Sequence, residues 1–204
     1  MTTRTTPFCT PAAAALALAL LVLPGCTSGG GSDNTVANQA QQVSGRDYIS
    51  GDGRIEAITA EQRGKPVELM GKTLDGTAWS SADHRGDVVV LNVWGSWCPP
   101  CVAEMPELQK AWSGMQADKL PVTFMGINLE DSPATAQAFL KRANATYPSL
   151  ADDGGASLIA LQEKASSPPT TLVLDKQGRI AARIAGEATA STLRGLVDDV
   201  LAEG

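Results

Sequence analysis

The sequence predicts an α/β domain in which a mixed β-sheet is sandwiched by helices. Two apolar runs of strand length, 88–94 (VVVLNVW) and 121–128 (PVTFMGIN), are typical of strands buried on both faces of a sheet. Segments with helical character separate these runs from a β-hairpin pattern near the C-terminus. Strands that alternate with helices and end in a hairpin indicate that one sheet contains both parallel and antiparallel pairs.

Each remaining element follows from local signals along the chain. Residues 67–79 (VELMGKTLDGTAW) predict a further hairpin that extends the domain on its N-terminal side. Residues 101–115 predict a helix that follows directly after the first buried run. After the second run, Asp131-Ser132-Pro133 supplies a capping residue and a first-turn proline for a helix over 134–144.

The last third of the chain predicts a helix, a hairpin and a closing helix. Residues 147–151 and a DDGG turn lead to a helix near 156–164. Strands at 171–174 and 179–184 flank a turn that contains glycine, which is the pattern of a β-hairpin. Residues 191–202 predict an amphipathic helix that closes the domain.

Length and charge limit the class of protein. A chain of 204 residues with 43% apolar residues can bury one good hydrophobic core. The formal net charge is −6 and the isoelectric point is near 4.8. This balance argues against nucleic acid as a partner and against electrostatic attachment to anionic lipid, because both need clusters of basic residues.

The N-terminus predicts export and a lipid anchor. Residues 1–25 combine Arg4 with an apolar run over 12–23, which is shorter than the ~20 residues that span a bilayer. Leu23-Pro24-Gly25-Cys26 resembles the lipobox of bacterial lipoproteins, which implies a lipoprotein signal peptide and a diacylglyceryl group on Cys26. An ordinary signal peptide followed by an unmodified cysteine is the alternative.

The domain organisation follows from this reading. Residues 26–47 are rich in Gly, Ser, Asn and Gln, which predicts a lipidated flexible tether. Residues 48–204 are then the folded domain. We expect it on the extracytoplasmic face of the bacterial cell membrane, a location in which disulfides persist.

Cys98 and Cys101 are the two cysteines left for the folded domain, and three kinds of site compete for them. A zinc site needs two further Cys or His ligands, but the chain has one histidine, His84, which we expect in a solvated turn. No metal is therefore expected. A purely structural disulfide is disfavoured, since closing so short a loop constrains the unfolded chain little. Cys98 would open a helix, whose N-terminus stabilises a thiolate, so a redox-active dithiol is favoured.

An extended motif around these cysteines identifies a family resemblance. The stretch NVWGSWCPPCVAEMP resembles the thioredoxin superfamily, and within it the TlpA/ResA-like extracytoplasmic thiol–disulfide oxidoreductases. The pattern W-C-x-P-C-x-x-E-x-P is met by Trp97, Cys98, Pro100, Cys101, Glu104 and Pro106. The resemblance runs from about residue 64 to the C-terminus. It implies a thioredoxin-like fold with an extra helix inserted between the second buried strand and the hairpin, and it implies no dissociable cofactor.

The resemblance also implies roles for individual residues. Cys98 would attack a disulfide and Cys101 would resolve the mixed disulfide. Pro169 would be a cis-proline opposite the dithiol, and Pro168 would offer its backbone to an extended substrate segment. Trp97 would shield the nucleophile and provide an apolar docking edge for the substrate.

Glu104 has two readings. It is either a carboxylate stabilised by the first turns of a helix, or a partly buried acid–base group that helps to deprotonate Cys101. The second reading is supported by Asn92, which stands where thioredoxin has a buried aspartate. Because an asparagine cannot accept a proton, another group must do so, and Glu104 is the candidate.

The family suggests a reductant of client disulfides, such as the haem-attachment dithiol of apocytochrome c, with electrons delivered by a membrane thiol transporter. Pro99 and Pro100 lack an N–H that could stabilise the Cys98 thiolate, which predicts a reduction potential near roughly −270 mV rather than −120 mV. An extracytoplasmic dithiol oxidant is one alternative. A non-catalytic lipoprotein that binds a partner through the same fold is another.

Overall fold

The computed structural model describes residues 55–203. The predicted signal peptide, the tether, the lipidation site at Cys26 and the domain boundary at residue 48 lie outside the described residues. None of the described helices is both long and apolar enough to cross a membrane.

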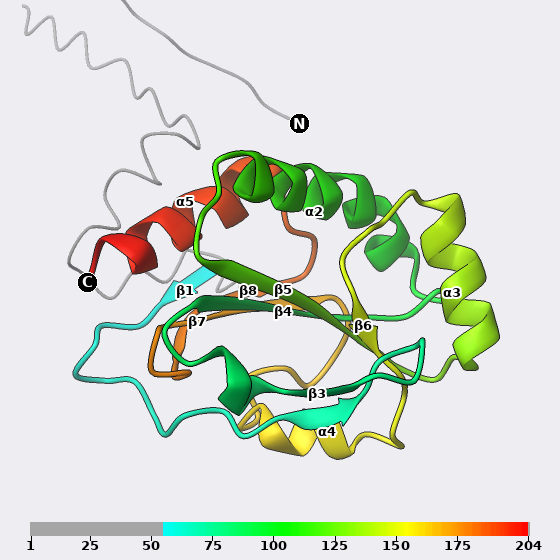
Figure 1. The fold of residues 1–204 in the computed structure, drawn as a ribbon, viewed down its shortest axis with the longest axis horizontal. Helices are drawn as coiled ribbons and strands as arrows, with labels where there is room; N and C mark the ends of the chain where they lie inside the picture. The colour runs from blue at the N-terminus through cyan, green and yellow to red at the C-terminus, as the bar shows by residue number, and fades with distance from the viewer. Residues whose placement is uncertain (1–54, 204) are drawn as a thin grey trace, which may run out of the picture. The chain divides into compact units, whose positions relative to one another are not determined.

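A mixed six-stranded sheet forms the centre of the described domain (Figure 1). The strand order is β1-β8-β7-β4-β5-β6. The pairs β4–β5 and β5–β6 are parallel, whereas β7 pairs antiparallel with both β4 and β8, and β1 pairs antiparallel with β8. The strands are β1 (Ile55–Ala57), β4 (Val88–Trp94), β5 (Val122–Asn128), β6 (Ser149–Leu150), β7 (Thr170–Leu174) and β8 (Ile180–Ala185).

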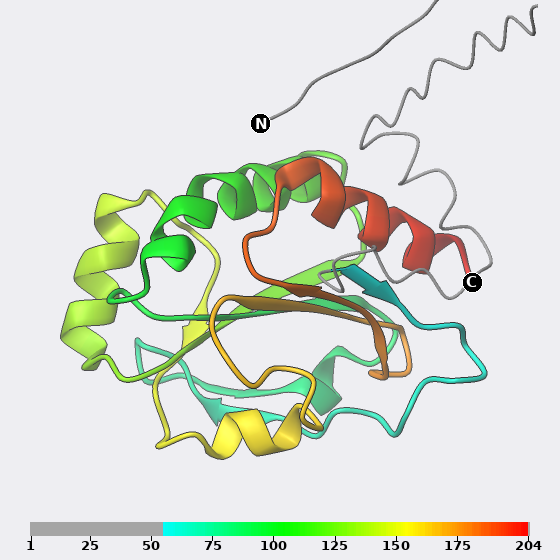
Figure 2. The same cartoon turned by 180° about the vertical axis from the view of Figure 1, so that it is seen from behind.

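Both faces of this sheet are covered. Helices α2 (Pro99–Ala117) and α5 (Ala190–Ala202) lie on one face, while α4 (Ala156–Ala160) and the hairpin β2–β3 lie on the other (Figures 1 and 2). Helix α3 (Pro133–Arg142) lies beside β6 at one side of the sheet. The hairpin strands are β2 (Met70–Lys72) and β3 (Ala78–Ser80), which confirms the hairpin predicted before the first buried run.

The burial pattern of β4 explains why two cores form. All seven residues of β4 are buried. Its alternate residues face opposite sides of the sheet, as the pleat requires. Val88, Val90 and Trp94 join the core beneath α2 and α5. Val89, Leu91 and Val93 join the second core with residues of the hairpin and the α4 region. Asn92 is the polar member of the first series and therefore points toward α2, like Val90 and Trp94.

Helix boundaries follow the capping signals. Helix α2 begins with two prolines, which are tolerated in the first turn because their missing N–H groups would be unpaired there. Helix α3 is capped by Ser132, whose side chain accepts a hydrogen bond from the Thr135 N–H. Helix α5 is capped in the same way by Thr189.

The structure differs from the sequence-based prediction at several places; helix α2, for example, extends two residues beyond each end of its predicted range. Helix α4 ends at Ala160 instead of 164, because Gln162 and Glu163 have φ values of 55° and 63°, which a right-handed helix cannot contain. Strand β1 was not predicted; it is three residues long and only partly buried. His84 is not solvated but partly buried: its ring stacks on Trp79 at 5.3 Å and its Nδ1 lies 3.1 Å from the Thr123 hydroxyl.

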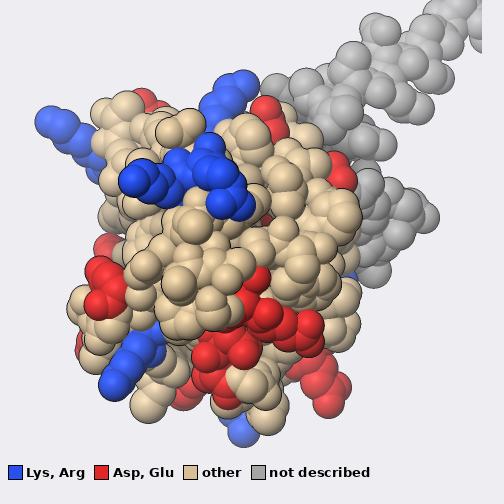
Figure 3. Space-filling model, turned by 90° about the vertical axis from the view of Figure 1, so that its right-hand side faces the viewer, with Lys and Arg blue, Asp and Glu red and all other residues tan. Residues whose placement is uncertain are grey.

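Charged side chains are grouped on the side of the domain that carries α3. Figure 3 shows acidic residues gathered in one region of this side and lysine and arginine residues gathered in another. On this side, acidic and basic side chains therefore form separate patches.

Candidate active site

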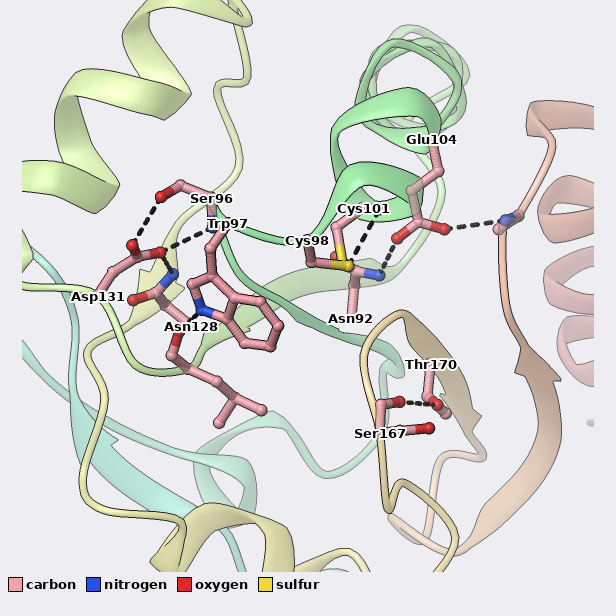
Figure 4. The surroundings of a disulfide bond; sticks show 12 residues. Asn92, Ser96, Trp97, Cys98, Cys101, Glu104, Asn128, Asp131, Ser167 and Thr170 are labelled. Atoms are coloured by element: carbon pink, nitrogen blue, oxygen red, sulfur yellow. Dashed lines mark hydrogen bonds between the residues drawn. A yellow bond between two sulfur atoms is a disulfide. The ribbon is translucent and has the colours of Figure 1, made fainter.

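The candidate site lies at one edge of the sheet, where several chain segments converge. Strands β4 and β5 are parallel, so their carboxyl ends, Trp94 and Asn128, reach the same edge. Strand β7 is antiparallel to β4 and therefore begins at this edge, at Thr170. The topology thus brings the predicted dithiol and the Pro168–Pro169 segment to one place (Figure 4).

Cys98 and Cys101 form a disulfide, with their Cα atoms 5.3 Å apart. Cys98 is 3% exposed and Cys101 is fully buried, so Cys98 is the more accessible of the two cysteines. This difference agrees with the roles expected for the two residues, in which Cys98 attacks a substrate and Cys101 resolves the product.

The start of α2 provides electrostatic stabilisation for a thiolate at Cys98. Cys98 is the N-cap of α2, and its Sγ accepts a hydrogen bond from the Cys101 N–H at 3.3 Å. The positive end of the helix dipole and this N–H both favour a negative sulfur. The sequence predicts stabilisation by the free N–H groups of a helix N-terminus, and the structure identifies the Cys101 N–H as one such donor.

The turn before Cys98 is fastened to the loop after β5. The Asp131 carboxylate accepts hydrogen bonds from the Ser96 N–H at 2.8 Å and the Ser96 hydroxyl at 2.6 Å. Asn128 donates to the same carboxylate at 2.8 Å. Burial opposes ionisation of Asp131, but these hydrogen bonds outweigh it and hold its pKa below the usual range. The sequence pattern indicates Asp131 only as part of a helix start.

The two tryptophans near the dithiol have different environments. Trp97 is 50% exposed, and its indole N–H donates to the Leu129 carbonyl at 2.9 Å, which fixes the ring beside the turn. Trp94 is fully buried, and its ring packs against Phe139. The exposed ring of Trp97 suits the docking edge that was expected for it, and Trp94 belongs to the core.

Glu104 lies on α2 with its carboxylate held at both oxygens (Figure 4). Its Oε1 accepts from Asn92 Nδ2 at 2.8 Å, and its Oε2 accepts from the Ala188 N–H at 2.9 Å. The residue is 2% exposed. Burial raises the pKa of Glu104 to about 7; the two hydrogen bonds oppose this rise, and the negative charge of Glu187 adds to it. A carboxyl group with this pKa can take up or release a proton near neutral pH.

The Pro168–Pro169 peptide bond is cis, as the family resemblance implied. Pro169 is buried, and its carbonyl accepts a hydrogen bond from the Gly186 N–H at 2.9 Å. Pro168 is partly exposed. The segment thus lies at the sheet edge where the dithiol is, with the more accessible of its two prolines in the position expected to meet a substrate.

Comparison with known proteins assigns the family. The family model described as Redoxin matches residues 55–200, which is most of the chain. The chain belongs to the redoxin family. The match covers the whole sheet, the dithiol, Glu104 and Pro169.

Two curated relatives of this redoxin are named for thiol–disulfide exchange. The thiol:disulfide interchange protein HelX of Rhodobacter capsulatus is 36% identical over 125 residues, which are 61% of this chain and 67% of the relative. The thiol-disulfide oxidoreductase ResA of Geobacillus thermodenitrificans is 31% identical over 121 residues, which are 59% of this chain and 67% of the relative.

Solved structures show the same fold. A secreted thiol-disulfide isomerase from Corynebacterium glutamicum is 34% identical, with a TM-score of 0.66 over 75% of this chain and 98% of that chain. A DsbF homologue from Corynebacterium diphtheriae is 35% identical, with a TM-score of 0.63 over the same shares. The redoxin therefore has the thioredoxin-like fold that its sequence predicts, and it is a thiol–disulfide oxidoreductase.

Proposed function

We propose that this redoxin is a membrane-anchored, extracytoplasmic reductant of client disulfides. The observation that carries the proposal is the asymmetric dithiol: Cys98, at the start of α2, keeps a small exposed fraction, whereas Cys101 is fully buried on the same helix as Glu104. One sulfur is thus placed to meet a partner, and the other is placed to act after the partner is bound.

The reaction begins with the dithiol reduced. The Cys98 thiolate attacks one sulfur of a client disulfide, the client S–S bond breaks, and the second client sulfur leaves as a thiolate. Cys101 then transfers its proton to Glu104 and attacks Cys98 Sγ. The mixed disulfide breaks, the first client sulfur leaves as a thiolate, and Cys98–Cys101 is left oxidised. Two electrons have passed to the client.

The environment of Glu104 supports its part in this sequence. A carboxyl group with a pKa of about 7 is ionised often enough near neutral pH to accept a proton and basic enough to hold it. The N–H groups of Asn92 and Ala188 hold its two oxygens, so the carboxylate that would accept the proton has a fixed orientation.

The partners and the location of the protein are part of the same proposal. The client is a disulfide-containing protein, such as apocytochrome c, and the electrons come from a membrane thiol donor. The lipobox-like sequence supports an anchor at Cys26. The secreted neighbour from Corynebacterium glutamicum supports an extracytoplasmic site of action. The Pro168–Pro169 segment and Trp97 would receive the client.

Trapping of mixed disulfides tests the exchange reaction. In Cys101→Ser, Cys98 can still attack a client, but no thiol remains at position 101 to resolve the mixed disulfide. We therefore expect covalent complexes with clients on non-reducing gels. Cys98→Ser is the matched control and should trap none, because Cys101 is buried. Cys9 and Cys26 do not confuse the result if the first is removed with the signal and the second is lipidated. Equal trapping by both variants would contradict the assigned order.

A separate experiment tests the anchor. Cys26→Ala should move the protein out of the membrane fraction or leave an unprocessed precursor, while the dithiol stays active in an insulin-reduction assay. The measurement is fractionation together with labelling by a fatty-acid probe. Labelling that persists in Cys26→Ala would show that the lipid is not attached at Cys26.

A further inference from the structure

Asn92 joins three secondary-structure elements at the floor of the site. It lies in β4, and its Nδ2 donates to Glu104 Oε1 on α2 at 2.8 Å and to Thr171 Oγ1 on β7 at 3.1 Å. Asn92 and Thr171 are fully buried, and Glu104 is 2% exposed. Both hydrogen bonds leave from the same nitrogen, so one amide group holds the carboxylate and the hydroxyl together.

The other half of this amide has no such role. Within residues 55–203, Asn92 Oδ1 is buried and has no hydrogen-bond partner. An unsatisfied buried acceptor costs about 1–3 kcal/mol, and most buried polar atoms in native proteins are paired. The two hydrogen bonds of Nδ2 account for an amide at this point, but in this arrangement they leave Oδ1 unpaired.

Reversal of the amide would give Oδ1 two partners and would leave Nδ2 as the unpaired end of the amide. Rotation of the amide plane by half a turn exchanges Oδ1 and Nδ2, and Oδ1 then faces Glu104 and Thr171. An ionised Glu104 excludes that arrangement, because it can only accept hydrogen bonds. A protonated Glu104 favours it, because its O–H can donate to Oδ1. The Thr171 hydroxyl fits both arrangements, since it can accept from Nδ2 or donate to Oδ1.

We propose that Asn92 is a positioning residue that reverses its side-chain amide when Glu104 gains a proton, and so passes the protonation state of Glu104 to Thr171. The proposal rests on the function proposed above, in which Glu104 takes the proton of Cys101. It adds a second consequence of that proton transfer, on a different strand.

The consequence reaches the segment expected to hold the substrate. Thr171 is the second residue of β7, which follows the cis peptide of Pro168–Pro169. A change in the hydrogen bond of Thr171 is therefore a change two residues from Pro169. In this way the strand that begins at the docking segment responds when Cys101 has given up its proton and the client is about to be released.

An asparagine suits this role better than an aspartate because it carries no charge. The charged and titratable groups that face Glu104 are few. Glu187 acts on it from the segment before α5, Tyr147 lies close to it from the segment before β6, and the cysteines lie on its own helix. A second carboxylate 2.8 Å away would compete for the same proton. With Asn92, the proton binds to Glu104 alone, and the Asn92 amide changes its orientation in response.

The direct test is a pH titration of the disulfide form of the full-length protein by NMR. We expect the side-chain NH₂ signals of Asn92 and the backbone amide of Thr171 to change with one midpoint, that of Glu104. Because the disulfide form performs no exchange, this measurement tests the relay even if the proposed reaction is wrong. Asn92 signals that do not change through the Glu104 midpoint would overturn the proposal.

Three variants separate coupling from mere packing. Asn92→Leu removes a hydrogen bond from both protonation states of Glu104, and the bond to the ionised carboxylate is the stronger, so Glu104 should bind its proton more tightly and the Thr171 amide should lose its response. Thr171→Val should leave the Asn92 response in place. Thr123→Val, on β5 and away from the dithiol, is the matched control and should change neither midpoint. A Thr171 response that survives in Asn92→Leu would show that the coupling takes another route.

Discussion

At the scale of single residues, Glu104 illustrates how burial and hydrogen bonding compete. Burial removes the carboxylate from water and raises its pKa, whereas the donors from Asn92 and Ala188 favour the charged form. Burial prevails, and the pKa is about 7. The residue is therefore neither a permanently charged helix-capping group nor a permanently neutral core group, which is the property that the proposed proton transfer from Cys101 requires.

This balance has a measurable effect on stability. The unfolded chain releases the Glu104 proton near pH 4.5 and the folded chain near pH 7, so the folded state holds the proton more tightly between these values. The free energy of unfolding should therefore fall by about 3 kcal/mol as the pH rises through this window. In Glu104→Gln this contribution is absent. Urea denaturation of the disulfide forms at several pH values measures the difference between the two proteins.

The expected result is a variant that becomes more stable relative to the wild type as the pH rises from 4.5 to 7. The disulfide form is used because its sulfurs do not titrate. Two stability curves that stay parallel over this range would show that the pKa of Glu104 is not raised in the folded state.

Residues differ in how far the sequence could predict their roles. Cys98, Cys101 and Glu104 share one helix, so a local motif was enough to find them. The interaction of Asn92 with Thr171 joins residues 79 positions apart, and that of Ser96 with Asp131 joins residues 35 apart. No local pattern contains these pairs, because they exist only once parallel and antiparallel strands have been brought to one edge of the sheet.

At the scale of elements, strong and continuous signals were predicted well. Strand β4 has the predicted bounds because seven buried residues in a row leave no alternative to a central strand. Helix α2 begins where two prolines follow a capping residue. Together they place Cys98 at the strand-to-helix junction, and the strength of these local signals explains why the dithiol could be found from the sequence.

Weak signals account for the elements that were missed. Strand β1 has three partly buried residues and owes its existence to pairing with β8, with Ile55 opposite Ile184. The end of α4 depends on the left-handed backbone of Gln162 and Glu163, residues that ordinarily favour helices. In both cases tertiary context decided the local structure. Sequence patterns of a few residues do not contain that context.

At the scale of the whole molecule, one sheet edge brings together the residues to which the proposed reaction assigns roles. The dithiol arrives from β4, the Asp131 contact from β5, the cis peptide from the start of β7, and the Ala188 donor from the segment after β8. This convergence results from strand order and direction.

The direction of electron transfer is also a property of the whole site. A strongly oxidising dithiol requires a greatly stabilised Cys98 thiolate. Here the prolines at 99 and 100 offer no N–H, and the structure supplies one donor, the Cys101 N–H at 3.3 Å. Glu104 adds a negative charge nearby when it is ionised. Stabilisation of the thiolate should therefore be moderate, which favours a reductant.

The reduction potential of the Cys98–Cys101 couple tests this account most directly. It is measured by equilibrating the purified full-length protein with glutathione buffers of known ratio and quantifying free thiols. The account predicts a potential near roughly −270 mV, which is that of a thioredoxin-like reductant dependent on delivered electrons. A potential above about −150 mV would contradict it and would identify the protein as an oxidant of extracytoplasmic thiols.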